Sequence, residues 1–412
     1  MIARRHLLYM LESSVFVREG VLDALLALGS SYCRVPVAAG QDPLCIPGAL
    51  SAPDETSEEE DAEQAALTTQ ERLENGDLSD AEFFSVCPQG SCTNTGCSED
   101  CLMLNIFTGK NATENAVATG ALLPVAIFVH GGSYNSGTGN IYPGGPLAHY
   151  WGGKGIVVTI NYRLGAFGFA GGEQLRKLDT NGGSTGNYGI QDQRMAFQWV
   201  QDNIAAFGGD KKRDMIFGES AGAGSMTMHL TMKKSFGLYS RAVAESGAFA
   251  QWNMQPMEQA QGYFDTLLVN AKCATAADQV LCLQALSMDE IKAAYKAIYT
   301  LDTNPYIYGP TVDGVEATQP AWLAAQNGGV NPVPIMFGTN RDEGSMFCDL
   351  NKEANLNDLN AWWDTYKVGK ETLNPLYVGK PYPTVDGYSV NLTLTLTLTR
   401  MEYHSPKTSS MR

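Results

Sequence analysis

Runs of uninterrupted apolar residues, separated by Gly-rich turns, mark the middle of the chain. Residues 124–129 are apolar at every position, and residues 155–160 nearly repeat that pattern. A strand with apolar side chains on both faces is typical of a parallel sheet that helices cover on both sides. Shorter apolar runs predict further strands of the same sheet at 99–107, 215–217, 241–247 and 333–338.

Helical periodicity fills the gaps between these strands. Ala196, Trp199 and Val200 recur at helical spacing before the stop signal Gly208-Gly209, and residues 254–327 carry further helical patterns. Strand and helix alternate along the chain. This order predicts an α/β fold with a mostly parallel central sheet and helices on both faces.

The two ends of the chain lack such regular patterns. Residues 54–63 form an acidic run typical of a solvated, flexible segment, and residues 391–399 alternate Leu and Thr in a strand pattern of low complexity. We therefore expect a divergent, partly disordered segment at 1–85, one α/β domain at 86–350 and a poorly defined tail at 351–412.

The charge balance excludes one class of partner. The chain of 412 residues has a formal net charge of −16, whereas a nucleic-acid-binding surface needs a basic face. No stretch approaches the roughly 20 uninterrupted apolar residues of a membrane span. We expect neither a nucleic-acid partner nor a transmembrane segment.

The nine cysteines favour disulfides over a metal site. The cluster Cys87, Cys92, Cys97 and Cys101 lacks a C-x2-C knuckle and has no neighbouring His, so we expect no metal there. Disulfides are typical of an oxidising compartment.

Glycosylation sequons point to the same compartment. They begin at Asn111 and Asn391, although residues 1–29 are a poor signal peptide because charges interrupt their apolar run. We expect a secreted or extracellular glycoprotein.

The candidate chemistry centres on the stretch Gly218-Glu219-Ser220-Ala221-Gly222, which follows one of the predicted strands. Glycines on both sides of Ser220 permit the sharp strand-to-helix turn that presents a serine as a nucleophile. Such a serine needs a base, an acid that orients the base, and amide donors for the oxyanion.

Two other loops supply candidates for these roles. The Gly-rich loop after the strand at 124–129 and the residue after the serine predict an oxyanion hole made by the amides of Gly132, Ser133 and Ala221. Asp342 and Glu343 both follow a later strand and both qualify chemically as the acid, while Glu219 is better suited to an electrostatic role.

Seven motifs in order resemble the type B carboxylesterase and cholinesterase family across residues 98–348. They are Ser-Glu-Asp-Cys-Leu-Met-Leu-Asn at 98–105, His-Gly-Gly-Ser-Tyr at 130–134, Asn-Tyr-Arg-Leu-Gly at 161–165, Gly-Asn-Tyr-Gly-Ile-Gln-Asp-Gln at 186–193, Phe-Gly-Gly-Asp at 207–210, Gly-Glu-Ser-Ala-Gly at 218–222 and Asn-Arg-Asp-Glu-Gly at 340–344. The resemblance implies an α/β-hydrolase fold that hydrolyses small carboxylic esters through a serine acyl-enzyme, without a cofactor.

The resemblance also implies a role for individual residues. It makes Ser220 the nucleophile and Glu343 the acid of the triad, with an oxyanion hole at Gly132, Ser133 and Ala221. It further implies supporting polar residues at Glu219 and Ser246, an acyl-pocket aromatic at Trp252, a disulfide between Cys273 and Cys282, and a second disulfide that joins Cys101 to Cys87, Cys92 or Cys97.

The chain departs from the family in three places. Residues 1–97 lack the usual opening segment, and no aromatic choline-binding loop is recognisable, so a choline ester has no support. The family's base is a His in a Gly-x-x-His setting well after the acid, and the one His after Glu343 is His404, in a different setting. We expect a triad without an identifiable base and an incomplete C-terminal part of the fold.

A non-catalytic alternative shares one motif. The stretch from His130 to Asn140 also resembles neuroligin-type adhesion proteins, which replace the nucleophilic serine. Because Ser220 is retained, the sequence favours the enzyme over the binding protein.

Overall fold

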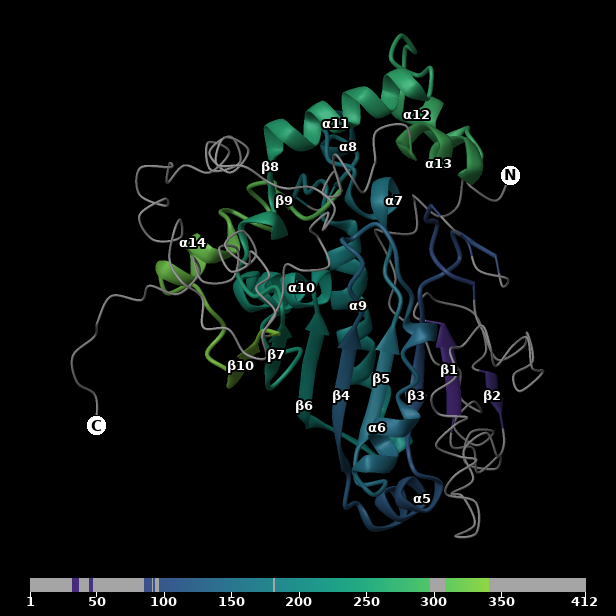
Figure 1. The fold of residues 1–412 in the computed structure, drawn as a ribbon, viewed down its shortest axis with the longest axis vertical. Coiled ribbons are helices and arrows are strands. Elements are labelled where there is room, and N and C mark those ends of the chain that lie inside the picture. Colours follow the sequence, from purple (N-terminus) through teal and green to yellow (C-terminus); the bar gives the residue numbers. More distant parts are fainter. Residues whose placement is uncertain are drawn as a thin grey trace, which may run out of the picture. The chain divides into compact units, whose positions relative to one another are not determined.

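The predicted strands belong to one eight-stranded sheet, which also contains two strands that the sequence did not predict (Figure 1). The computed structural model describes residues 32–36, 44–46, 85–90, 92, 96–180, 182–296 and 308–340. The strand order is β10-β7-β6-β4-β5-β3-β1-β2. The chain divides into two units, Met1–Phe337 and Gly338–Arg412, and nearly all described residues belong to the first.

Four parallel strands make the centre of the sheet. They are β4 (Leu123–Val129), β5 (Ile156–Ile160), β6 (Gly209–Glu219) and β7 (Ala242–Glu245). Both neighbours of β4 run parallel to it, and β7 runs parallel to β6. All five side chains of β5 are buried, as expected for a strand covered on both faces. The mostly parallel sheet with helices confirms the predicted fold class.

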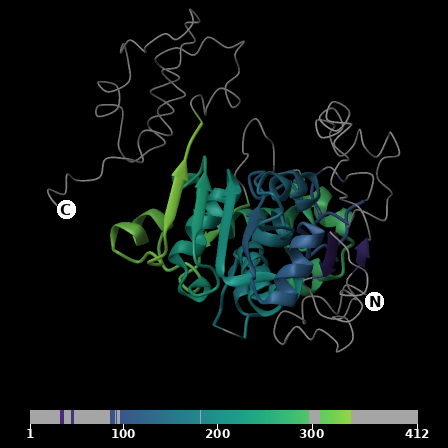
Figure 2. The same ribbon diagram turned by 90° about the horizontal axis from the view of Figure 1, so that it is seen from below.

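The edges of the sheet hold shorter strands. On one side β3 (Met103–Phe107) pairs antiparallel with β5, followed by β1 (Tyr32–Pro36) and β2 (Leu44–Ile46); on the other side lies β10 (Ile335–Gly338). Figure 2 shows these two groups at opposite edges. The sequence did not predict β1 and β2, because strands of five and three residues are too short for a periodic pattern.

Helices cover both faces of the sheet, and the pleat sorts the apolar side chains between them. The main core packs Val158 of β5 against α9 (Tyr188–Asn203) and α10 (Ala221–Thr231). The neighbouring Val157 points to the opposite face, where it packs with α6 (Gly145–Tyr150) in a second, smaller core.

The remaining elements connect the strands or lie beyond their carboxyl ends. Figure 1 shows α11, α12 and α13 beyond the ends to which the parallel strands point. The bounds are α5 (Lys110–Thr119), η3 (Gly139–Ile141), α7 (Gly165–Phe169), α8 (Glu173–Arg176), η4 (Ile204–Phe207), η5 (Lys233–Ser235), η6 (Gln251–Asn253), β8 (Gln255–Pro256), α11 (Met257–Asn270), α12 (Gln279–Gln284), α13 (Met288–Lys296), β9 (Thr311–Val312) and α14 (Ala321–Gln326).

In the described residues between 85 and 296, disulfides join three pairs of cysteines. Cys273 bonds to Cys282, as the family resemblance implied. Cys101 bonds to Cys87, which decides between the three partners that the sequence left open, and Cys92 bonds to Cys97. Within the residues that the structure describes, no helix is long and apolar enough to cross a membrane.

A buried carboxylate links three elements of the main core. Glu316 accepts two hydrogen bonds from the Arg194 guanidinium, at 2.7 and 3.0 Å, and one from Lys234 at 2.8 Å. The side chains of Glu316 and Arg194 are only 3% and 16% exposed, so water screens this ion pair little, whereas Lys234 is 53% exposed. Glu316 therefore ties α9 and η5 to the segment after β9.

We expect Glu316→Gln to lower the free energy of unfolding by about 3 kcal/mol, because it removes the buried carboxylate that pairs with the partly buried Arg194. Urea denaturation monitored by tryptophan fluorescence measures the change. Glu173→Gln is the matched control, since Glu173 pairs with Arg176 at an exposed site. We expect it to cost about 0.5 kcal/mol or less, and equal effects of the two substitutions would contradict the prediction.

Candidate active site

The candidate nucleophile lies at the turn between β6 and α10. Ser220 has φ 56° and ψ −119°, a conformation that L-residues rarely adopt. Two backbone hydrogen bonds hold it there: the Ser220 amide donates to the Glu245 carbonyl at 2.9 Å, and the Gly224 amide donates to the Ser220 carbonyl at 2.9 Å. The turn is thus the strained strand-to-helix geometry that the sequence predicted.

The glycines around Ser220 allow this turn to lie against β4. A Cβ placed on Gly222 would overlap the carbonyl oxygen of Val129, the last residue of β4. A Cβ on Gly218 would lie 2.7 Å from the same oxygen. Glycine is therefore required on both sides of Ser220, because two backbones approach closely at the carboxyl end of the sheet.

The predicted oxyanion loop lies directly beside the nucleophile. A Cβ on Gly131 would be 2.8 Å from the Glu219 carbonyl oxygen and 3.0 Å from Cβ of Ser220. The next three residues, Gly132, Ser133 and Tyr134, have φ of 102°, 53° and 60°. This conformation turns the loop sharply, and consecutive backbone amides must turn in this way to point at one anion. The assignment of the Gly132 and Ser133 amides as donors stays a prediction.

The third predicted donor, the amide of Ala221, belongs to the first residue of α10. The amides of a first helical turn have no partners within the helix, and they carry the positive end of the helix dipole. The dipole of this eleven-residue helix therefore favours negative charge that develops next to Ser220.

The two predicted supporting residues border the elbow. Glu219 is exposed. The pKa of Tyr142 is raised mainly by the burial of Tyr142, and the negative charge of Glu219 raises it further. Ser246 follows β7 with φ 57°, and a Cβ on the next residue, Gly247, would lie 2.6 Å from the Ser220 carbonyl oxygen. The turn at 246–247 therefore packs against the backbone of the elbow.

Trp252 stands farther along the same segment. It is half-buried and packs against the main core, and its neighbour Asn253 donates a hydrogen bond to the Gly247 carbonyl at 2.6 Å. The position fits both an acyl-pocket wall and an ordinary core side chain, so the role that the resemblance implied stays a prediction.

The predicted acid and the one histidine after it lie outside the described residues; these are Glu343, its neighbour Asp342, and His404. Three histidines lie within the described ranges. His149 is exposed on α6, and His229 is buried between Ser235 and Gln193, with ring nitrogens 2.9 and 3.0 Å from their side-chain oxygens. His229 is therefore occupied in packing.

His130 is closest in sequence to the oxyanion loop, but its ring is buried. Its Nδ1 donates to the Gly131 carbonyl at 2.7 Å, and the ring stacks on Tyr162 with centroids 4.4 Å apart. Burial lowers the pKa of His130 to about 4 and that of His229 to about 3. Both rings are neutral at ordinary pH, and neither is a candidate base.

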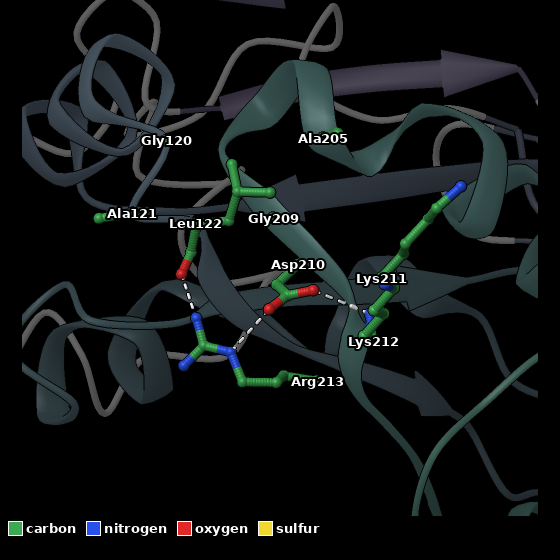
Figure 3. A pocket seen from close by; sticks show the side chains of 9 residues that line it. All are labelled: Gly120, Ala121, Leu122, Ala205, Gly209, Asp210, Lys211, Lys212 and Arg213. Carbon is green, nitrogen blue, oxygen red and sulfur yellow. Dashed lines mark hydrogen bonds and ion pairs between the residues drawn. The ribbon is translucent and has the colours of Figure 1, made fainter.

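A concave site lies at the end of β6 opposite to Ser220. A pocket of about 640 Å³ is lined by Lys211, Lys212 and Arg213, and Arg213 donates to the Asp210 carboxylate and the Leu122 carbonyl (Figure 3). In open parallel sheets, reactive groups gather at the carboxyl ends of the strands. This pocket lies at the amino ends of β4 and β6, so we assign no catalytic role to it.

A mostly parallel sheet with a strained serine turn after a central strand defines the α/β-hydrolase class of fold. The chain belongs to the carboxylesterase family, which matches residues 48–377. Among solved structures, a carboxylesterase of Geobacillus stearothermophilus superposes with a TM-score of 0.59 at 29% identity over 78% of this chain and 63% of its own. A PNB esterase superposes with a TM-score of 0.59 at 30% identity over 72% of this chain and 58% of its own.

The similar curated proteins include a cholinesterase, a neuroligin and a crystal protein. Mouse cholinesterase is 37% identical over 62% of this chain and 41% of its own length. Mouse neuroligin-2 is 35% identical over 62% of this chain and 31% of its own, and the crystal protein of Dictyostelium discoideum is 34% identical over 63% and 45%. The chain thus spans less than half the length of these relatives.

Two residues that contact the loop carried no role in the sequence analysis. The Tyr162 hydroxyl donates to the His130 carbonyl at 2.9 Å, and Asn161 Oδ1 accepts from the Gly139 amide at 2.8 Å. Both follow β5, which runs beside β4. Their place at the start of the Asn-Tyr-Arg-Leu-Gly motif is the one signal that could have pointed to them.

We expect Gly222→Ala to destabilise the fold by about 3 kcal/mol or to displace the elbow, because the added methyl overlaps the end of β4. Gly262→Ala is the matched control, since a Cβ at this exposed position in α11 meets nothing within 4 Å. We expect that change to stabilise the helix by up to about 1 kcal/mol. Thermal unfolding separates the two variants, and a tolerated Gly222→Ala would refute the close approach.

The buried histidines also predict a pH dependence of stability. Below about pH 6.5 the unfolded chain protonates a His that stays neutral in the folded protein, so stability falls as pH falls. For each of His130 and His229 we expect a loss of about 1.5 kcal/mol between about pH 6.5 and pH 5.

Urea denaturation at these two pH values tests this dependence in His229→Gln. The pH-dependent loss should shrink by about 1.5 kcal/mol relative to the wild type, whatever the variant's overall stability. An unchanged loss in His229→Gln would contradict the prediction.

Proposed function

We propose that this carboxylesterase-family chain hydrolyses small carboxylic esters through an acyl-enzyme on Ser220. The observation that carries the proposal is the strained turn of Ser220, with the 131–134 loop in contact with it. Holding a non-glycine residue in such a conformation costs about 1–3 kcal/mol. Strain of this kind is typical of a catalytic site, because it points the hydroxyl toward a substrate.

In the proposed reaction Ser220 Oγ attacks the ester carbonyl carbon and loses its proton to a base. The carbonyl oxygen becomes an oxyanion, which the amides of Gly132, Ser133 and Ala221 stabilise by hydrogen bonds. The tetrahedral intermediate then expels the alcohol, which takes up a proton. Water attacks the acyl-enzyme by the same route and releases the carboxylic acid. Glu343 is the proposed acid that orients the base.

The base is the part of the triad that the sequence does not identify. An elbow and an oxyanion hole without a base retain a residual rate, but they lose orders of magnitude relative to a complete triad. Two properties of the chain can therefore be tested separately: reaction of Ser220 with a highly reactive probe, which needs the elbow, and ester turnover, which also needs the base in both of its steps.

A neuroligin-like binding protein is the alternative. The similarity to neuroligin-2 and the His-Gly-Gly-Ser-Tyr loop favour it. The retained Ser220 favours the hydrolase, because a strained strand-to-helix turn of this kind presents a serine as a nucleophile. The disulfides support an extracellular location for either function.

We expect a fluorophosphonate probe to label the wild-type chain and to leave Ser220→Ala unlabelled, because the probe phosphonylates an activated serine. Ser287→Ala is the control, since Ser287 lies before α13 and bonds to Glu290. Hydrolysis of p-nitrophenyl acetate should fall to background in Ser220→Ala and should keep the wild-type rate in Ser287→Ala. Equal labelling of the wild type and Ser220→Ala would exclude the proposed nucleophile.

Turnover is tested separately in His404→Ala. Labelling of the wild type without ester turnover would mean that the elbow is formed and the base is absent. Turnover that disappears in His404→Ala would make His404 the base, despite its sequence setting.

A further inference from the structure

The loop at 131–137 stores backbone strain next to the nucleophile. Ser133 and Tyr134 are consecutive non-glycine residues with positive φ, at 53° and 60°. Each such residue costs roughly 1 kcal/mol or more, so the loop keeps its shape only where surrounding contacts fix it. The close packing of Gly131 against Ser220 fixes one end of the loop, so other contacts must fix its far end.

Gln89 holds the far end of the loop through both halves of its side-chain amide. Its Nε2 donates to the Gly137 carbonyl at 3.1 Å, and its Oε1 accepts from the Gly137 amide at 3.0 Å. The residue is only 7% exposed. The glutamine side chain therefore pairs with the backbone of Gly137 as a neighbouring strand would.

Gly137 in turn packs against the start of the loop. A Cβ on Gly137 would lie 2.8 Å from the Gly131 carbonyl oxygen and would overlap the His130 ring. A displacement of Gly137 would therefore change its packing against the His130 ring and the Gly131 carbonyl. Gly131 is the residue that touches Ser220 and precedes the first proposed oxyanion donor.

A disulfide fixes Gln89 itself. Cys87, two residues before it, is buried and bonds to the buried Cys101. Gln89 Nε2 also donates to the Cys87 carbonyl at 3.2 Å. The Cys101 carbonyl accepts from Asn161 Nδ2 at 3.1 Å, and Asn161 Oδ1 accepts from the Gly139 amide. The disulfide segment thus contacts the end of β5 through Asn161 and the loop through Gln89, and Asn161 also holds the start of η3, which follows the loop.

We propose that Gln89 is a positioning residue, which holds the 131–137 loop in the shape that an oxyanion hole needs. The inference deepens the proposed function and rests on it. Gln89 does not touch the substrate; it acts through Gly137 and Gly131. A glutamine suits the task because its amide offers a donor and an acceptor in one plane, whereas a glutamate offers acceptors alone.

Gln89→Met tests the proposal because methionine keeps the volume of the side chain and removes its hydrogen bonds. Gln201→Met is the matched control. Gln201 Nε2 also donates to two backbone carbonyls, those of Lys211 and Leu238, but near the opposite end of β6 from Ser220. Both variants lose side-chain amide hydrogen bonds, at a buried site for Gln89 and at a partly buried one for Gln201, and only Gln89→Met releases the loop.

We expect kcat for p-nitrophenyl acetate, and the rate constant of fluorophosphonate labelling, to fall about tenfold in Gln89→Met, with KM changed less than about twofold. We expect kcat to fall without a matching change in KM because the oxyanion forms only after the ester has bound. Gln201→Met should keep the wild-type kcat and labelling rate. Gln89→Glu, which keeps an acceptor for the Gly137 amide, should lie between Gln89→Met and the wild type.

Hydrogen exchange of peptides that cover residues 131–137 gives a readout that needs no activity. We expect faster exchange in Gln89→Met than in Gln201→Met. Unchanged exchange, or a kcat equal to that of Gln201→Met, would overturn the inference. A wild type that neither labels nor hydrolyses would refute the proposed function alone, while faster exchange in Gln89→Met would still support Gln89 as the residue that holds the loop.

Discussion

The close approach of two backbones at the carboxyl end of the sheet is the constraint on which the site depends. The serine turn lies so near to the end of β4 that a methyl group on Gly222 would overlap the Val129 carbonyl. The same approach brings the loop after β4 into contact with Ser220. Parallel pairing of β4 and β6 produces it, because both strands then deliver their carboxyl ends to one place.

Several residues around this point have strained backbone conformations, and hydrogen bonds from several elements stabilise these conformations. Ser133, Tyr134, Ser220 and Ser246 all have positive φ, and they belong to three different turns. The Glu245 carbonyl holds the elbow, while Tyr162 and Gln89 hold the loop. A site of this kind needs support from distant parts of the chain, because each turn alone would relax to a lower-energy conformation.

Most of the fold could be predicted from local patterns. The central strands and α9 show in the sequence because burial on two faces makes a strand apolar throughout and burial on one face gives a helix its period. The edge strands β1 and β2 were missed, since short strands leave no such pattern. The partner of Cys101 also had to come from the structure, because spacing permitted three choices.

The sequence by itself determined the family and the candidate nucleophile, because Gly-Glu-Ser-Ala-Gly records a local backbone requirement that only small residues meet. Only the tertiary structure decided which residues support the loop. Gln89 and Gly137 are 48 positions apart, and their pairing depends on a disulfide and on the order of strands in the sheet. Such contacts leave no local pattern, because chain folding alone brings the two segments together.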